Sequence, residues 1–151
     1  MLVPDAHQTL LIFLVIWGAC IASGCWESYV EGRNAWDAGK LGWKFRIGSY
    51  TLTAYHFYLF WITYPLLLTL PFVFTGWNTR LLGVILSAYA TGIVLEDFTW
   101  YIVNPAVQFK EWFTPFSDYY PWIRVRSRKI VPVLYVAGIA IALLSWFFLW
   151  K

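Results

Sequence analysis

Charged residues are scarce in this sequence, and so are the residues that most often bind metals or form disulfides. Only 13% of the 151 residues are charged, and the chain has two cysteines, two histidines and one methionine. Cys20 and Cys25 lie in or beside one apolar stretch, without the spacing of a disulfide framework or a Cys/His metal site. They are interpreted as small packing residues. The net charge of +3 is too small to indicate a nucleic-acid partner.

The motifs of several catalytic classes are missing as well. No phosphate-binding loop, dinucleotide fingerprint or Ser or Cys in a glycine-rich elbow occurs. Neither an HxxxH nor an ExxH pair is present, and His7 is expected on the far side of the membrane from His56. This counts against a di-iron or multi-histidine metal enzyme. The sequence therefore identifies no cofactor and no particular metal.

Apolar and aromatic residues are abundant instead, at 60% and 22% of the chain. A soluble domain of this size would not bury so much apolar surface, which predicts an integral membrane protein. The expected fold is all-α: a four-helix transmembrane bundle with two aromatic-rich interfacial loops, in a single domain over residues 1–151. Because a span needs about 20 helical residues, the predicted spans are about 9–26, 50–74, 81–103 and 130–150.

The basic residues predict how these spans are oriented. The loops 25–49 and 104–129 carry nine of the eleven Lys and Arg residues, and the opposite side carries only Arg80 and Lys151. Positive charge favours the cytoplasmic side, so both termini are predicted to be non-cytoplasmic. Residues 1–8 contain no Lys or Arg, so the first span is expected to be a retained helix and not a cleaved signal peptide.

The two predicted cytoplasmic loops are rich in Trp, Tyr and Phe, which suits segments lying in the headgroup layer. A basic run just before the fourth span is a candidate lipid-headgroup site, or an orientation signal only; its members are Arg124, Arg126, Arg128 and Lys129. Small residues four apart on three spans indicate closely packed helices. These pairs are Gly18 with Ala22, Ala88 with Gly92, and Gly138 with Ala142.

Two adjacent carboxylates, Glu96 and Asp97, lie inside the third span, where an ionisable group is costly and a functional or pairing role is the first expectation. Helical geometry places Glu96 on the face of the small residues, with Asp97 about 100° away. His56 of the second span is expected at nearly the same depth, because each residue lies about 9–12 Å of helix from the same membrane surface. Glu27 and Glu31 are expected near the mouth of this layer.

These residues define the candidate site, whose proposed ligand-binding members are Glu96, Asp97, His56, Thr99 and Asn104. Such a cluster is suited to handling a proton, to acid–base chemistry or to binding a divalent cation. Glu96, Asp97 and His56 are also the catalytic candidates. The alternative is a structural role, in which the carboxylates bond to neighbouring groups and only fix the packing.

The segment Glu96-Asp97-Phe98-x-Trp100-Tyr101-x-x-Asn104-Pro105, with the aromatic stretch from Pro115 to Trp122, resembles a family of small uncharacterised prokaryotic multi-span membrane proteins. The resemblance is confined to residues 96–122 and implies a family signature, without an activity, substrate or cofactor. The chain departs from the pattern at Ile123, where a histidine is expected, and this puts a metal role of that loop in doubt.

The leading hypothesis is a small membrane protein whose buried Glu/Asp/His site binds a proton, an ion or a small ligand, or a subunit of a membrane assembly. One alternative is an enzyme acting on a lipid or quinone with Glu96 as general base, and another is a purely structural accessory protein. Besides the lipid bilayer, a homo-oligomer or a membrane-protein partner is expected if the protein transports its ligand, because four short spans leave little room for an internal path.

Overall fold

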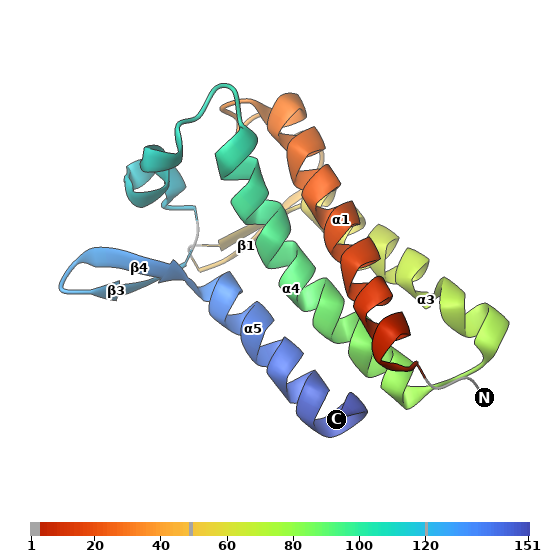
Figure 1. Ribbon diagram of the computed structural model, residues 1–151. Helices are drawn as coiled ribbons and strands as arrows, with labels where there is room; N and C mark the ends of the chain where they lie inside the picture. The colour runs from red at the N-terminus through yellow and green to blue at the C-terminus, as the bar shows by residue number, and fades with distance from the viewer. Residues whose placement is uncertain (1–3, 49, 120) are drawn as a thin grey trace.

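The computed structural model describes residues 4–48, 50–119 and 121–151, and these are mostly helical. Four helical segments in the described chain are long and apolar enough to cross a membrane, which suggests a multi-pass membrane protein. They pack together side by side (Figure 1). The four are α1 (Ala6–Glu31), the segment Ala54–Thr75, α4 (Thr79–Val103) and the segment Val133–Trp150.

Helix α4 is the centre of the bundle, with α1 on one side and α5 (Val133–Ser145) on the other (Figure 1). Glycines allow both contacts. A Cβ atom on Gly24 would overlap the carbonyl oxygen of Glu96, and one on Gly138 would lie 2.8 Å from the carbonyl oxygen of Ala90. Gly18, by contrast, faces open space. A Cβ atom on Gly92 of α4 would likewise lie 2.7 Å from Sγ of Cys20, so the predicted small residues of α4 and α5 mark close packing, whereas Gly18 of α1 does not.

The second span has three parts: α2 (Ala54–His56), the π-helical segment η1 (Phe57–Thr63) and α3 (Tyr64–Thr75). Pro65 in the first turn of α3 has no backbone N–H and cannot donate to the preceding turn. A π-helical turn is one way to accommodate such a loss. The fourth span likewise ends in a π-helical segment, η4 (Trp146–Trp150).

The loops contain strands that the all-α expectation omits. β1 (Lys44–Ile47) pairs with β2 (Tyr50–Thr53), and β3 (Trp122–Val125) pairs with β4 (Arg128–Pro132). Basic and apolar residues alternate over the four residues of β1, which suits a strand but is too short to predict one, and β3 begins with two apolar residues. Arg126 and Ser127 have positive φ angles of 47° and 68°, typical of a tight hairpin turn. The second and fourth helices therefore start at Ala54 and Val133, and not at residues 50 and 130.

The loop between α4 and α5 also contains two short 3-10 helices, η2 (Phe109–Phe113) and η3 (Pro115–Ser117). Trp112 of η2 is buried against the ends of α4 and α5, with its ring centroid 5.7 Å from those of Tyr101 and Tyr135. Phe113 stays exposed. The sequence predicts that this loop lies in the headgroup layer. In the structure, part of it instead folds back onto the helices and forms an aromatic cluster with them.

Candidate ion-binding site

Helix α1 contributes two carboxylates to the site from its last turns. It continues past Trp26 and ends at Gly32, whose positive φ angle of 54° is unfavourable for other residues. Glu27 and Glu31 lie four residues apart, which places them on one face of the helix. Both are buried, with exposures of 4% and 8%. They belong to the bundle interior and not to a loop beyond the first span.

The second span contributes His56 from its first turn. The Thr53 hydroxyl, which caps this turn, lies 2.7 Å from Nδ1 of His56. Trp36 stacks on one side of the imidazole, with a centroid distance of 4.0 Å, and Phe60 lies parallel to it at 6.2 Å. An imidazole that binds a metal through one ring nitrogen is usually held by a hydrogen bond to the other, as the Thr53 hydroxyl holds Nδ1 here. These contacts leave Nε2 directed at the interior, 4.0 Å from Oε1 of Glu31.

Helix α4 contributes Glu96 and Asp97, which point in different directions, as helical geometry predicts. Asp97 accepts a hydrogen bond of 2.6 Å from the Tyr135 hydroxyl of α5. Glu96 is buried, and its carboxyl group lies against that of Glu27. Two carboxylates in contact away from water repel each other strongly. This pair therefore requires a shared proton or a bound cation.

A small cavity of about 40 Å³ lies where these side chains meet. Its lining residues are Glu27, Glu31, Trp36, His56, Phe60, Glu96, Asp97, Trp100 and Tyr119. Oε1 of Glu27 and Oε1 of Glu96 are shielded from solvent and accept no hydrogen bond of normal geometry from any described residue. The volume exceeds the 10–15 Å³ that a single water molecule needs. The cavity is thus large enough for one ion or a water molecule.

The spacing of the side chains suits coordination. One ligand atom each from Glu27, Glu31 and His56 can be chosen so that all three lie within 4.8 Å of one another. Ligand atoms of one zinc-like ion lie about 3–4.4 Å apart, because each bond to the metal is about 2.0–2.2 Å. The three atoms are therefore only slightly farther apart than the ligand atoms of one bound ion.

Lys40, from the loop after α1, supplies a positive charge at the edge of the site. Its Nζ lies 2.6 Å from Oε1 of Glu31 and also donates to the carbonyl of Asn34. It lies 5.7 Å from the centre of the Tyr55 ring. Its ammonium group pairs with Glu31, whereas the cavity is lined by four carboxyl groups, those of Glu27, Glu31, Glu96 and Asp97. The site therefore has more acidic than basic groups.

Thr99 and Asn104, the other two predicted ligands, do not line the cavity. The Thr99 hydroxyl donates to the carbonyl of Leu95 in its own helix. Asn104 ends α4 and ties it to the end of α1, because its side-chain amide donates to the carbonyl of Gly32 at 2.9 Å. Both residues therefore make structural hydrogen bonds.

The sequence predicts His56, Glu96 and Asp97 at one level, and all three line the cavity. It predicts Glu27 and Glu31 only near the mouth, because the predicted first span ends at Trp26. The four-residue spacing of the two glutamates, continuing the helix past Trp26, was the available signal. Trp36 and Tyr119 come from loops, and no pattern in the sequence indicates that they line the site.

The chain matches no family model, no curated protein and no solved structure. The resemblance of residues 96–122 to a prokaryotic family therefore stays an expectation, and function is inferred from the chemistry of the site.

Proposed function

We propose that this protein is a multi-pass membrane protein that binds one divalent cation between α1, the second span and α4. Glu27, Glu31 and His56 are the first ligands, and Glu96 is a fourth. The observation that carries the proposal is the pair of buried carboxylate oxygens, on Glu27 and Glu96, that accept no normal hydrogen bond and border a cavity the size of an ion. Two buried carboxyl groups in contact are costly when both are charged, and a cation between them would offset that cost.

The donor atoms favour a first-row transition metal. One imidazole nitrogen with carboxylate oxygens suits Zn²⁺, Mn²⁺, Fe²⁺ or Co²⁺, whereas Ca²⁺ and Mg²⁺ prefer oxygen ligands only. No thiol is among the residues lining the described cavity, which disfavours Cu⁺.

Proton handling is the second candidate function, and the contact between the carboxyl groups of Glu27 and Glu96 favours it. Without a cation, such a pair is stable when it shares one proton. A lipid or quinone enzyme with Glu96 as general base receives less support. A cavity of about 40 Å³ is far smaller than the 300–1,000 Å³ that small-molecule sites usually have.

The distribution of Lys and Arg supports an orientation with both termini outside the cytoplasm. In that orientation the cation site lies at the cytoplasmic end of the bundle, next to the loop that contains Lys40. Four spans can hold a binding site but leave little room for a path across the membrane. Transport would therefore need a second copy of the chain or a membrane-protein partner. The mass of the protein in mild detergent tests for such an assembly.

The deciding experiment is a metal titration of purified, chelator-treated protein. We expect one Co²⁺ or Zn²⁺ per chain by elemental analysis, with the visible absorption bands of Co²⁺ bound by nitrogen and oxygen. Glu27→Gln and His56→Gln should each lose the metal while circular dichroism shows an unchanged helix content. Glu111→Gln, which changes a partly exposed glutamate in the loop after α4, is the control and should keep it.

Two results would overturn the cation assignment. One is wild-type protein that binds no divalent ion after chelator removal, and the other is binding that survives both site substitutions. In either case, infrared absorption of a protonated carboxyl group that is lost in Glu96→Gln would identify the proton site instead.

A further inference from the structure

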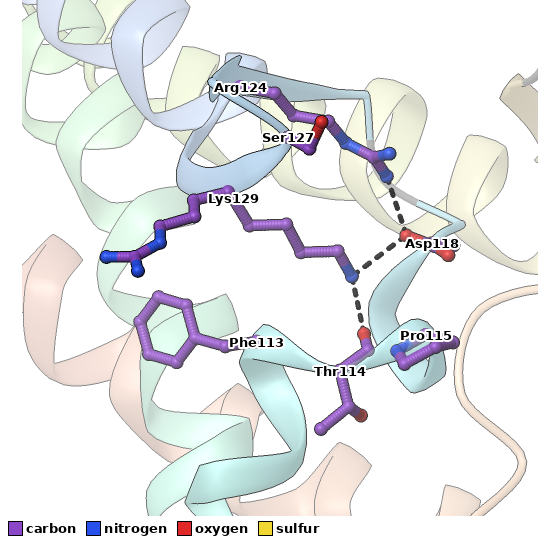
Figure 2. A pocket seen from close by; sticks show the side chains of 8 residues that line it. Phe113, Thr114, Pro115, Asp118, Arg124, Ser127 and Lys129 are labelled. Carbon is purple, nitrogen blue, oxygen red and sulfur yellow. Dashed lines mark hydrogen bonds and ion pairs between the residues drawn. The ribbon is translucent and has the colours of Figure 1, made fainter.

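A second pocket lies outside the bundle, between the η2–η3 segment and the β3–β4 hairpin, with a volume of about 480 Å³ (Figure 2). Phe113 and Pro115 line it from the first segment. Arg124, Arg128 and Lys129 line it from the hairpin. It shares no lining residue with the cavity of the candidate ion-binding site and has the opposite charge.

The basic side chains are held in place to different degrees. Asp118 pairs with Arg124 at 2.8 Å and with Lys129 at 2.9 Å, as the dashed lines in Figure 2 show. The contact with Lys129 lowers the pKa of Asp118, so this carboxyl group is charged at neutral pH. Arg128 forms no ion pair with any described residue. Three cationic side chains against one carboxylate leave two positive charges, with Arg128 available to a ligand.

The pocket also stands where a lipid headgroup would be. Strand β4 leads directly into α5 at Val133, where the fourth candidate span begins. The hairpin projects sideways from the end of α5 (Figure 1). Its aliphatic side chains Ile123, Val125 and Ile130 are exposed beside the basic ones. Apolar and basic side chains combined in this way suit the boundary between headgroups and acyl chains.

We propose that this pocket binds the phosphate group of an anionic phospholipid. Arg128 holds the phosphate through its guanidinium group, whose geometry matches two phosphate oxygens. Arg124 and Lys129, fixed by Asp118, add positive charge behind it. The exposed ring of Phe113 and the aliphatic side chains of the hairpin contact the glycerol and upper acyl chains. The occupant is therefore a lipid and not free phosphate, and this inference does not depend on the cation site.

The chain offers a matched control for a test. Arg126 lies two positions before Arg128 in the turn of the same hairpin, but it does not line the pocket. Arg128→Gln and Arg126→Gln remove the same charge from nearly the same place. A specific pocket therefore predicts different effects of the two changes, whereas general attraction to an acidic surface predicts equal ones.

The experiment is native mass spectrometry of the detergent-solubilised full chain, titrated with phosphatidylglycerol or phosphatidylcholine. We expect one phosphatidylglycerol per chain, bound in preference to phosphatidylcholine. Arg128→Gln should weaken this binding about fivefold or more, because one basic residue beside an anionic lipid has an effect of about that size. Arg126→Gln should weaken it less than twofold, because Arg126 does not line the pocket. Arg128→Lys should give an intermediate affinity.

Equal losses of phosphatidylglycerol affinity in Arg128→Gln and Arg126→Gln would overturn the proposal that the pocket binds a phospholipid. Equal binding of phosphatidylglycerol and phosphatidylcholine would overturn it too. Displacement of the lipid by glycerol 1-phosphate at equal concentration would show that the pocket recognises phosphate alone, which overturns the lipid assignment. The thermal unfolding temperature of each variant is measured beside the binding. If Arg128→Gln unfolds early, Arg128→Lys against Arg126→Lys repeats the comparison at unchanged charge.

Discussion

Helix α4 and the second span are both apolar enough to cross a membrane, yet the protein uses them differently. Half of the most apolar stretch of α4 is buried, while none of the corresponding stretch of the second span is. The sole buried residue of Ala54–Thr75 is His56. Packing therefore holds α4 in place, whereas the second span is attached by a few polar contacts and by Leu68 and Phe72, which pack partly buried against the core between α1 and α4.

Those polar contacts come from three residues. The Tyr64 hydroxyl donates to Ser23 of α1 at 2.5 Å, and the Tyr89 hydroxyl of α4 donates to the carbonyl of Phe60 at 2.6 Å. His56 supplies the third attachment, at the site itself. The comparison teaches that two equally apolar helices can differ in burial, with one at the centre of the bundle and the other at its edge, where it contributes His56 to the polar cavity.

The largest expected effect breaks the packing of α4 against α1. Gly24→Ala should destabilise the protein by about 1–3 kcal/mol or more, because the added methyl group overlaps the backbone of Glu96. Thermal or denaturant unfolding in detergent measures it. Gly18→Ala on the same helix, where nothing lies within 4 Å, should be neutral. Equal effects of the two changes would contradict the close approach at Gly24.

The next effect concerns the ligand that the second span presents. Thr53→Val removes the hydroxyl group that holds Nδ1 of His56 and should weaken metal binding about 10–100-fold. Competition with a chelating dye measures the affinity. Thr69→Val, in the exposed part of the same span, should leave metal binding unchanged. If both variants bind metal as the wild type does, the hydroxyl group does not orient the imidazole.

A smaller effect is expected at the Tyr64–Ser23 hydrogen bond. A double-mutant cycle with Tyr64→Phe and Ser23→Ala should give a coupling energy of about 0.6 kcal/mol, the usual size for hydrogen bonds between membrane helices. The free energy of unfolding of the four proteins is measured under one set of conditions. A coupling near zero would mean that this bond does not attach the second span.

The smallest effect lies outside the membrane, where Arg33 after α1 pairs with Glu111 after α4 at 2.8 Å. Arg33 lowers the pKa of Glu111 from 4.5 to about 2. The folded state therefore gains stability that is present above pH 4.5 and is lost as the pH falls towards 2. Glu111→Gln should flatten that slope of unfolding temperature against pH, and Arg33→Gln should flatten it less, because the backbone N–H of Gln108 still lowers the pKa of Glu111. Arg33 is exposed and Glu111 partly so, and solvent screening makes the slope shallow.

The sequence predicts the four long apolar helices and the common level of His56, Glu96 and Asp97, because both follow from helix rise and hydrophobic length. It does not predict that α1 ends at Glu31, since an aromatic residue near a span end reads as an interfacial anchor. The two hairpins are not predicted either, for a different reason. Each strand has only four or five residues, too few for a clear pattern.

Asn104 shows a further limit. Its position before a proline indicates a helix end, but the partner that its side chain binds, Gly32, is 72 positions away. Long-range hydrogen bonds of this kind are fixed by tertiary packing, which no local pattern encodes. The same holds for Trp36, a loop residue that stacks on His56.

The ammonium group of Lys40, held 2.6 Å from Glu31, gives the proposed cation site a tethered competitor. A ligand group on a short loop has an effective concentration in the millimolar range. An incoming cation therefore displaces a neighbour that never diffuses away, and the site regains a counter-ion as soon as the cation leaves. Such a site exchanges its ion instead of trapping it, at the cost of part of the affinity that its carboxylates would otherwise provide.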